Sequence, residues 1–543
     1  MNLVIGSGPA AVSCTDAILK NGESVTMIDV GYRLEPQTQN RIDSIANQSP
    51  SDWTEMDRAA IKGELMPSRA GVEKKLIFGS EYPYRIPDAD EEIQKNQVDV
   101  FASYSKGGFS NVWGAAVMPY RDGDIADWPI AQRDLAPHYS EVEKWLRIRR
   151  HDDDPLANEF PYFSNCNESA LKVSSQSQQL IDNYKKYSNQ LAQTGMYFGP
   201  ARTAIGNECQ YCGQCLFGCP YDQIFSAGEK IEEFLKLLDR FTYLPSILVK
   251  SIDEFESGVV VRGKNLENDS EFEINGKRCY LGAGALNSAR IILHSEKIYD
   301  RKISLKYSEY FMFPIFQFRR TKSAMTEPST ALCQIFGEVF NRGISKYSVH
   351  LQFYSYNELF RQTFENSFGF IFKLFRPFFH YLLQHLVIVQ GYMHSDDSSE
   401  MEISLVQVQS GHPELRVNGI RNPGVKSKVN KLISLFRLNS FRLGAIPLGF
   451  LKSVGPIGKG FHFGGSFPMT NDTPKHESGR FHGTDPTVEP PMYSDELGRP
   501  LGRKWTHLID SSVFPSIPAT TITFTVMANA RRIGYESTKR GAV

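Results

Sequence analysis

The sequence predicts an α/β fold in which a nucleotide-binding βαβ unit is joined to a second, α+β domain with an antiparallel sheet. Two observations carry this prediction. Residues 1–29 read as a strand, a glycine turn, a helix and a second strand. Farther along, Phe311–Phe318, Ser348–Tyr356 and Glu402–Gln409 are alternating, aromatic-rich segments of strand length. At 543 residues the chain is long enough for two domains.

The composition excludes nucleic acid as a partner. Hydrophobic residues make up 41% of the chain, charged residues make up 22%, and the formal net charge is −1. This balance provides no global electrostatic attraction for a polyanion. Leu3–Ile5 already reads as a strand that enters a turn at Gly6, which argues against a secretory signal and favours a cytoplasmic location.

The first glycine turn has the pattern of a dinucleotide site. Gly6–Ala11 (GSGPAA) follows a strand and precedes a helix, and Asp29 ends the next strand. The first glycine permits a tight turn, the second lets the backbone approach a pyrophosphate, and Ala11 allows the helix to pack closely on the sheet. The helix N-terminus then faces the phosphates, and Asp29 can accept hydrogen bonds from ribose hydroxyls. The turn alone does not decide between FAD and NAD.

Four later segments complete a family pattern. They read GGFSNVWG at Gly107–Gly114, LGAGALNSAR at Leu281–Arg290, FHFGGSFPM at Phe461–Met469 and IDSSVFPSIP at Ile509–Pro518. With the N-terminal turn, and in this order, they resemble the glucose–methanol–choline (GMC) oxidoreductases, which are FAD-dependent alcohol oxidases and dehydrogenases. The cysteine-rich, ferredoxin-like loop described below points to a bacterial branch of that family.

The resemblance implies a discontinuous FAD-binding domain and a substrate domain over the reactive face of the flavin. The predicted FAD-binding domain comprises residues 1–150, 200–302 and 455–543. The predicted substrate domain comprises residues 151–199 and 303–454, where the resemblance is weakest. The chain therefore enters each predicted domain more than once.

The residues that the resemblance assigns to FAD come from the matched segments. Some family members attach FAD covalently to a histidine, but residues 105–120 contain none, so non-covalent FAD is expected. The predicted cofactor-binding residues are Gly6, Gly8, Pro9, Ala10, Ala11, Asp29, Gly107, Gly108, Ser110, Asn111, Trp113, Gly114, Ala283, Gly284, Asp510 and Ser511.

The resemblance also assigns a catalytic pair. Hydride transfer from an alcohol carbon requires a base within hydrogen-bond reach of the hydroxyl group, with a pKa near the working pH. His462, in the segment that resembles the family's histidine motif, is the predicted base, and a purely structural histidine is the alternative. The family carries a second His or Asn after its C-terminal motif, and Thr521 occupies that position here. Thr521 can orient an alcohol but cannot act as a strong base.

A run of cysteines carries the second chemical signal. Cys209, Cys212, Cys215 and Cys219 lie in a cysteine-rich loop at 207–222, with the C-x2-C-x2-C-x3-C-P spacing of bacterial ferredoxins. They are the predicted ligands of a 4Fe–4S cluster. In two-cluster ferredoxins the fourth cysteine ligates the other cluster, so a single cluster needs the fourth cysteine bent back or a distant one. The distant candidates are Cys14, Cys166, Cys279 and Cys333.

Two other interpretations of the cysteine run stay open. Four clustered cysteines can hold zinc in a tetrahedral site. Thiols can also pack, or undergo redox chemistry, without any metal. A cluster would take single electrons from reduced flavin, which favours a dehydrogenase with an external electron acceptor over an oxidase.

Two amphipathic stretches, 367–393 and 426–452, are predicted to be helices of the substrate domain. Both combine aromatic or leucine-rich faces with basic residues, as helices that lie in a membrane interface do. Lys373, Arg376 and Pro377 argue against a helix that spans the bilayer. Peripheral contact with the inner face of the membrane is therefore predicted, and a buried lid or a dimer contact is the alternative.

Together these features predict an FAD-dependent dehydrogenase that oxidises a CH–OH group of a sugar-type, lipid-linked or otherwise amphiphilic alcohol. One alternative is a flavin or iron–sulfur electron-transfer protein. Another is a flavin-dependent reductase or isomerase without net alcohol oxidation. The departure from the family at Thr521 keeps both alternatives open.

Overall fold

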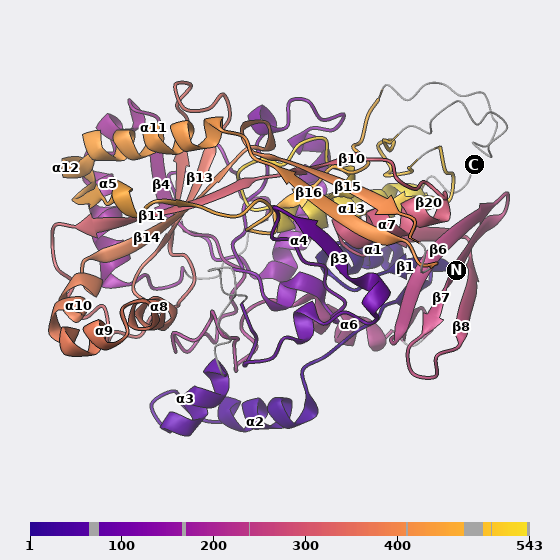
Figure 1. Ribbon diagram of the computed structural model, residues 1–543, viewed down its shortest axis with the longest axis horizontal. Coiled ribbons are helices and arrows are strands. Elements are labelled where there is room, and N and C mark those ends of the chain that lie inside the picture. Colours follow the sequence, from indigo (N-terminus) through magenta and orange to yellow (C-terminus); the bar gives the residue numbers. More distant parts are fainter. Residues whose placement is uncertain are drawn as a thin grey trace.

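A parallel sheet and a large antiparallel sheet lie toward opposite ends of the molecule, and the N-terminus lies near the parallel sheet (Figure 1). The computed structural model describes residues 1–63, 75–151, 153–164, 170–237, 239–408, 411–471, 492–500 and 502–539. Parallel and antiparallel sheets are both present, which confirms the predicted α/β fold class.

The parallel sheet is assembled from strands that lie far apart in the sequence. Across the sheet these are β20 (Thr506–Leu508), β9 (Arg278–Leu281), β1 (Asn2–Ile5), β2 (Val25–Ile28) and β5 (Phe241–Leu244). Every pairing is parallel. All residues of β1, β2 and β9 are buried, because a parallel sheet is covered on both faces.

Helices and a small meander surround the parallel sheet. Helix α1 (Pro9–Lys20) packs against α13 (Thr523–Lys539), which also packs against α4 (Gln132–Leu146). The remaining elements on this side are α6 (Ala227–Leu235), α7 (Ala285–Ser295) and the antiparallel strands β6 (Ile247–Phe255), β7 (Gly258–Asn265) and β8 (Glu271–Gly276). Helices α2 (Pro36–Ala46) and α3 (Glu55–Lys62) project at the bottom of Figure 1.

A five-stranded sheet lies between the two ends of the molecule. Its order is β19 (Phe463–Gly464), β10 (Ile303–Tyr307), β15 (Glu400–Val406), β16 (Glu414–Ile420) and β3 (Ile93–Asn96). Inner residues such as Leu305, Ile403 and Leu415 share one hydrophobic core with Leu3 and Leu281 of the parallel sheet. These strands therefore pack with the nucleotide-binding side, although the domain boundary predicted at 303 assigns three of them to the substrate domain.

One face of the large antiparallel sheet is apolar, and the opposite face mixes polar with apolar side chains. Its strands are β17 (Ala445–Pro447), β11 (Glu309–Gln317), β14 (Leu386–Met393), β13 (Val349–Tyr354), β12 (Ile335–Val339) and β4 (Met196–Pro200), with β18 (Ser453–Val454) paired to β11. Because neighbouring residues of a strand point to opposite faces, Phe311, Leu351 and Val389 pack under helices, whereas Gln352 and Gln390 face away from them. The covering helices are α5 (Ser175–Ala192), α11 (Gly424–Leu438) and α12 (Ser440–Leu443).

The structure corrects both predicted amphipathic helices. The first prediction, 367–393, covers the end of α8 (Glu358–Phe368), α9 (Phe370–Leu374) and α10 (Arg376–Leu383), and then strand β14. Val387 and Val389 are β-branched residues of β14, which pairs with two neighbouring strands, so sheet packing outweighs the apparent helical period.

The second predicted helix, 426–452, also stops early. Helix α11 ends at Leu438 and α12 ends at Leu443. Gly444 then adopts a left-handed conformation with φ of 66°, which ends the helix and leads into β17. None of the helices in the described part of the chain combines the length and the apolar character that a membrane span requires.

Replacing Gly391 with alanine is expected to destabilise the large sheet. An added Cβ at Gly391 would lie 2.1 Å from the ring of Phe311, which is fully buried in the core. Overpacking of this kind usually costs about 1–3 kcal/mol. We expect a melting temperature several degrees below that of the wild type, whereas Gly228→Ala, whose Cβ meets only ordinary contacts at 3.4 Å and beyond, keeps the wild-type value. Equal melting temperatures for the two variants would contradict this packing.

Candidate active site

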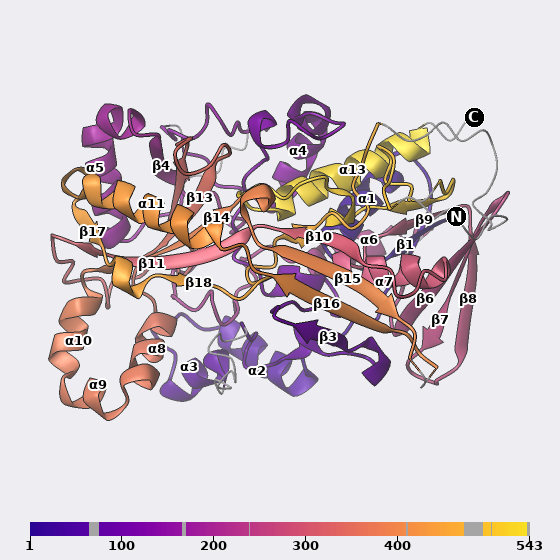
Figure 2. The same cartoon turned by 45° about the horizontal axis from the view of Figure 1, so that its top comes forward.

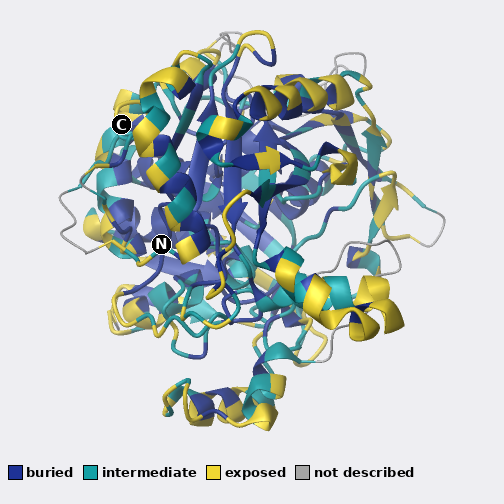
Figure 3. Cartoon of the chain, turned by 90° about the vertical axis from the view of Figure 1, so that its left-hand side faces the viewer, coloured by how far each residue is buried: buried dark blue, intermediate teal, exposed yellow. Residues whose placement is uncertain are grey.

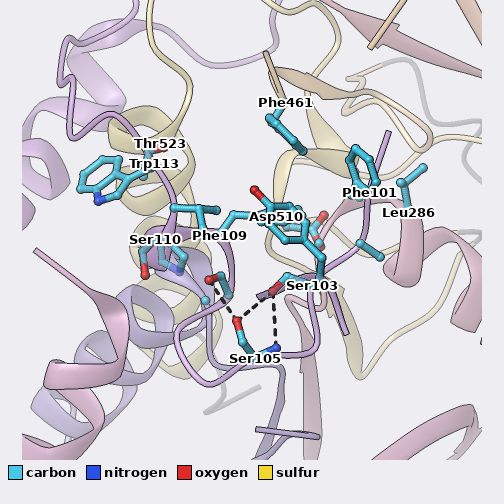
Figure 4. A pocket seen from close by; sticks show the side chains of 18 of the residues that line it. Phe101, Ser103, Ser105, Phe109, Ser110, Trp113, Leu286, Phe461, Asp510 and Thr523 are labelled. Atoms are coloured by element: carbon cyan, nitrogen blue, oxygen red, sulfur yellow. Dashed lines mark hydrogen bonds between the residues drawn. The ribbon is translucent and has the colours of Figure 1, made fainter. Parts of the chain in front are cut away.

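A cavity of about 830 Å³ extends from the first glycine turn to the face of the large sheet that the helices leave uncovered. Gly6, Gly8 and Asp29 line it near the parallel sheet, and Gln352 and Gln390 line it near the large sheet. This volume lies in the range of cofactor and small-molecule sites. Figure 4 shows part of the wall, where aromatic, serine and acidic side chains come from separate segments of the chain.

The glycine turn packs closely on the protein on one side and opens to the cavity on the other. Gly6 has φ of 92°, and a Cβ there would lie 2.5 Å from the carbonyl oxygen of Gly282. A Cβ on Gly8 would meet no protein atom within 4 Å. Helix α1 begins at Pro9 with no side-chain cap, so its first N–H groups are available to an anion in the cavity.

Asp29 lies at the cavity but already has partners. Its carboxylate accepts hydrogen bonds from the Ser7 hydroxyl and, at 3.2 Å, from the Tyr243 hydroxyl. Burial raises the pKa of Asp29 to about 7, and these hydrogen bonds partly oppose the shift. Ser7 also accepts from the Gly107 backbone N–H at 2.9 Å, so it links the first glycine turn to the second glycine loop.

The second glycine loop divides its predicted residues between two roles. Gly108, Ser110, Trp113 and Gly114 line the cavity, as does Phe109 between them. Figure 4 shows the hydrogen bonds that hold the start of this loop, including one of 2.9 Å between the Ser103 and Ser105 hydroxyls.

Gly107 and Asn111 support the loop and do not line the cavity. The Asn111 amide donates to the carbonyl oxygens of Lys106 and Gly108, both at 2.9 Å, and its oxygen accepts from Ser226 at 3.0 Å. Ala11 is fully buried on the inner side of α1. The sequence pattern identifies such residues but does not separate a contact with a ligand from support of the loop.

The C-terminal segment holds the histidine loop in place. Asp510 lines the cavity and accepts from Ser288 and Ser512, and burial raises its pKa. The Ser511 hydroxyl donates to the carbonyl oxygen of Phe463 at 2.7 Å. Gly464 leaves room for this contact, because a Cβ there would lie 2.1 Å from the carbonyl oxygen of Ser511. Ser511 therefore positions the residue that follows His462.

His462 borders the cavity as a neutral imidazole. Burial, with a smaller contribution from the neighbouring His350, lowers its pKa to about 3. Its ring stacks on Tyr392 with centroids 4.9 Å apart. Its Nδ1 atom has no hydrogen-bond partner among the described residues. The imidazole is therefore able to accept a proton, but its pKa lies well below the range expected from the sequence.

Thr521 borders the same cavity, just before α13. Its hydroxyl is buried and likewise has no partner in the described part of the chain. An unpaired buried polar atom costs free energy, so two of them at one cavity are best explained by a ligand that completes their hydrogen bonds.

A polar wall from the large sheet faces these two residues. Gln352 and Gln390 are direct cross-strand partners of β13 and β14, and both line the cavity. The Tyr354 hydroxyl donates to the Gln352 amide oxygen at 3.0 Å. The side chain of Gln390 makes no hydrogen bond within the described ranges. Tyr310 and Tyr392 add two more hydroxyl groups to this wall.

A buried pair supports the polar wall from behind. His350 Nδ1 lies 2.6 Å from Glu338 Oε1, and Gln352 Nε2 lies 3.2 Å from His350 Nε2. Burial raises the pKa of Glu338 well above its usual value and lowers the pKa of His350 to about 3. Both shifts favour the neutral forms, so a neutral hydrogen-bonded chain fixes the amide of Gln352.

Comparisons with solved structures identify the fold. A structure of pyridoxine 4-oxidase from Mesorbium loti matches 98% of this chain and 98% of its own, with a TM-score of 0.57 and 13% sequence identity. A structure of formate oxidase matches 100% of this chain and 98% of its own, with a TM-score of 0.61 and 12% identity. Both are GMC oxidoreductases. The chain has the GMC fold. No protein-family model and no curated protein matches the sequence itself.

The cysteine loop lies against the cavity of this GMC fold. Leu216, inside the loop, lines the cavity. The Lys75 ammonium donates to the Trp113 carbonyl oxygen at 2.8 Å, and both residues line the cavity as well. Burial lowers the pKa of Lys75 to about 8, and the thiols of Cys215 and Cys219 partly oppose this shift. The loop is therefore adjacent to the site.

The predicted cluster finds no support in the described residues. Burial raises the pKa of all four thiols, to about 11 for Cys212, so the thiol forms are favoured. Within the described ranges, no group of three or more His, Cys, Asp or Glu side chains is arranged to hold a metal ion. Cys166, one candidate for a distant ligand, lies outside these ranges. The described residues therefore do not support a 4Fe–4S cluster or a zinc site.

The residues of the polar wall were missed from the sequence for two reasons. Gln352 and Tyr354 belong to an expected strand, but the alternation does not tell which face meets a cavity. Gln390 and Tyr392 fall in the stretch predicted as a helix, whose period places them differently. Assigning residues 386–393 to a strand would have placed Gln390 and Tyr392 on the same face of the sheet.

Replacing His462 with glutamine is expected to reduce the loss of stability in acid. The pKa of His462 is about 3 in the folded protein and about 6.5 in an unfolded chain. Between these values only the unfolded state takes up the proton, so stability falls as the pH falls through this window. Each pH unit below about 6 should favour the variant over the wild type by up to about 1.4 kcal/mol. The measurement is the denaturation midpoint between pH 7 and pH 4, and parallel curves for the two proteins would contradict the pKa.

Proposed function

We propose that the chain is an FAD-dependent oxidoreductase that oxidises a CH–OH group. The observation that carries this proposal is that His462 and Thr521 place unpartnered polar atoms in the same cavity as an open glycine turn at a helix N-terminus. Two solved structures that share this fold are a pyridoxine 4-oxidase and a formate oxidase, which supports redox chemistry but not a particular substrate.

The cavity has the features that a flavin dinucleotide requires. Gly8 and Gly284 have space for close approach of a ligand to the backbone, because a Cβ on either would meet no protein atom within 4 Å. The uncapped start of α1 suits a pyrophosphate, and Asp29 suits a ribose. Trp113 and Phe109 supply aromatic surface farther along the wall. FAD bound here would accept a hydride, and no histidine in the second glycine loop is available to attach it covalently.

His462 acts as the acceptor of the hydroxyl proton in this proposal. Its imidazole is neutral across physiological pH, and Nδ1 has no competing partner in the described part of the chain. Thr521 orients the alcohol oxygen through its hydroxyl group. Gln352 and Gln390 hold the rest of the substrate by hydrogen bonds, since both amides line the polar wall. A sugar-type or amphiphilic alcohol suits a wall of amides and tyrosines.

The electrons must then pass to an external acceptor. The spacing of Cys209, Cys212, Cys215 and Cys219 favours an iron–sulfur relay as one route to that acceptor. An iron and acid-labile sulfide assay on anaerobically purified protein tests whether this relay is present. A flavin spectrum without iron would retire the relay and leave the alcohol chemistry untouched.

A flavin-dependent electron-transfer protein is the second candidate. The observation in its favour is Thr521, which replaces the second His or Asn of the family. Anaerobic mixing with sugar-type and long-chain alcohols distinguishes the two. Bleaching of the flavin by at least one alcohol supports the oxidoreductase, and no bleaching by any supports the electron-transfer protein.

Gly8→Ala is expected to weaken FAD binding without disturbing the fold. The added methyl group meets no protein atom but occupies space at the mouth of the turn. We expect flavin affinity to fall about tenfold or more, measured by flavin fluorescence, because this position must let the backbone approach the pyrophosphate. Gly123→Ala, whose Cβ would meet only the Arg121 side chain away from the cavity, is the matched control. Unchanged affinity in the Gly8 variant would place the dinucleotide elsewhere.

His462→Gln is expected to slow flavin reduction with little change in FAD content. Loss of a general base typically costs about 10²–10⁴-fold in rate. The experiment is anaerobic stopped-flow reduction by whichever alcohol bleaches the wild-type flavin. His507→Gln is the control, because His507 is buried away from the cavity and its Nδ1 lies 2.9 Å from the Leu497 carbonyl oxygen. Equal rates for the wild type and the His462 variant would remove His462 from the mechanism.

A further inference from the structure

The exposed apolar side chains of the molecule gather at one end. Thirteen of the nineteen exposed large apolar side chains in the described part of the chain come from α8–α10, from the residue after β11, and from 438–451. These thirteen, here called the apolar end, are Phe318, Phe368, Phe370, Ile371, Leu374, Phe375, Phe378, Tyr381, Leu438, Phe441, Ile446, Phe450 and Leu451. A concentration of this kind marks an interaction surface.

Direct contacts join these segments into one surface. The Arg320 guanidinium donates to the Gln384 amide oxygen at 2.5 Å and lies 4.9 Å from the centre of the Tyr381 ring. The backbone N–H of Phe318 donates to the Gly444 carbonyl oxygen at 2.8 Å. Helices α9, α10 and α12 accordingly lie at the end of Figure 1 opposite the N-terminus, and Figure 3 views this end with its exposed residues in yellow.

Helices α9 and α10 are well packed against each other, although several of their apolar side chains are exposed. Phe372 and Phe379 are buried and stack with centroids 4.9 Å apart, and they fasten α9 and α10 to each other. By contrast, Phe370 is 75% exposed and Leu374 is 61% exposed on the same helices. Helices α9 and α10 therefore bury one set of apolar side chains against each other. The described residues leave a second, outward-facing set uncovered.

The apolar end is also cationic. Residues 366–394 and 424–454 contain no aspartate or glutamate, although the whole chain is close to neutral. Within the described ranges, eight of the basic residues that accompany the apolar side chains form no ion pair, whereas Lys428 of α11 pairs with Asp397. The eight unpaired residues are Arg319, Arg320, Lys322, Lys373, Arg376, Arg437, Arg442 and Lys452. A surface that joins bulky apolar side chains to unpaired cations is complementary to an anionic lipid interface.

Helix α8 connects this surface to the cavity. Leu359 and Phe360, in its first turn, line the cavity, and Phe368, its last residue, is exposed. The distance along the helix from Phe360 to Phe368 is about 12 Å, at 1.5 Å per residue. Phe368 packs on Phe379 at 4.9 Å, so the same helix that borders the cavity is fixed to the apolar end.

We propose that the apolar end docks peripherally on an anionic lipid bilayer and holds the α8 side of the cavity beside the lipid phase. A second copy of this chain is a poorer occupant, because two cationic surfaces repel each other. The docking itself does not depend on the proposed function. Only the delivery of an amphiphilic alcohol from the bilayer to the cavity rests on that function.

Vesicle pelleting of the full-length chain tests the docking. The probes are phosphatidylcholine vesicles and vesicles that also contain phosphatidylglycerol. We expect the wild type to pellet with the anionic vesicles and to be released by salt. The triple variant F370S/L374S/F375S should bind about tenfold less tightly or worse, because it removes three exposed apolar side chains. The matched control M56S/F255S removes exposed apolar side chains elsewhere and should bind like the wild type.

A charge-reversed pair tests the electrostatic part of the same surface. K373E/R376E should lose binding to anionic vesicles, whereas R133E/K277E, with the same change in net charge at a distance, should retain most of it. Absence of wild-type pelleting, or equal pelleting of F370S/L374S/F375S and the wild type, overturns the proposal. The proposal is also overturned if light scattering without vesicles shows that the wild type is a dimer and that, among the variants, only F370S/L374S/F375S is monomeric. No outcome depends on turnover, so failure here is distinct from failure of the proposed function.

Discussion

The close approach of two backbone turns organises the nucleotide-binding side of the molecule. Gly6 packs on the carbonyl of Gly282, so that the ends of neighbouring strands β1 and β9 meet without side chains between them. This contact brings the starts of α1 and α7 to the same end of the cavity. Ser7 then links the turn to Gly107, and through it to the second glycine loop. A side chain at Gly6 would separate these parts, which explains why sequence segments nearly three hundred residues apart share one site.

The second organising constraint is the alternation of the large antiparallel sheet. One face is covered by α5, α11 and α12, and the opposite face presents Gln352, Gln390 and Tyr392 to the cavity. Behind that wall the neutral pair of Glu338 and His350 is joined by a hydrogen bond away from water. The site is thus polar but carries few charges at this wall. Such an environment also explains why His462 is neutral in the folded protein.

Much of the nucleotide-binding side followed from the sequence, because its signals are local. Glycine turns, a strand before each turn and a helix after it depend on neighbouring residues, and the fold prediction made from them is confirmed. The stretch 386–393 shows the limit of this reasoning. Its residues fit a helical stripe, yet they pair with two strands that lie elsewhere in the sequence, and such pairing leaves no local trace.

The sequence by itself determined the order of the glycine motifs, the α/β class and the candidates His462 and Thr521. These depend on backbone conformations and residue types that short segments carry with them. Tertiary structure alone decided that Asn111 supports a loop, that Gln352 and Gln390 face the cavity, and that burial lowers the pKa of His462 to about 3. It also decided that the exposed aromatic residues form one cationic end. Each of these properties depends on which distant segment lies opposite a side chain, and only packing sets that.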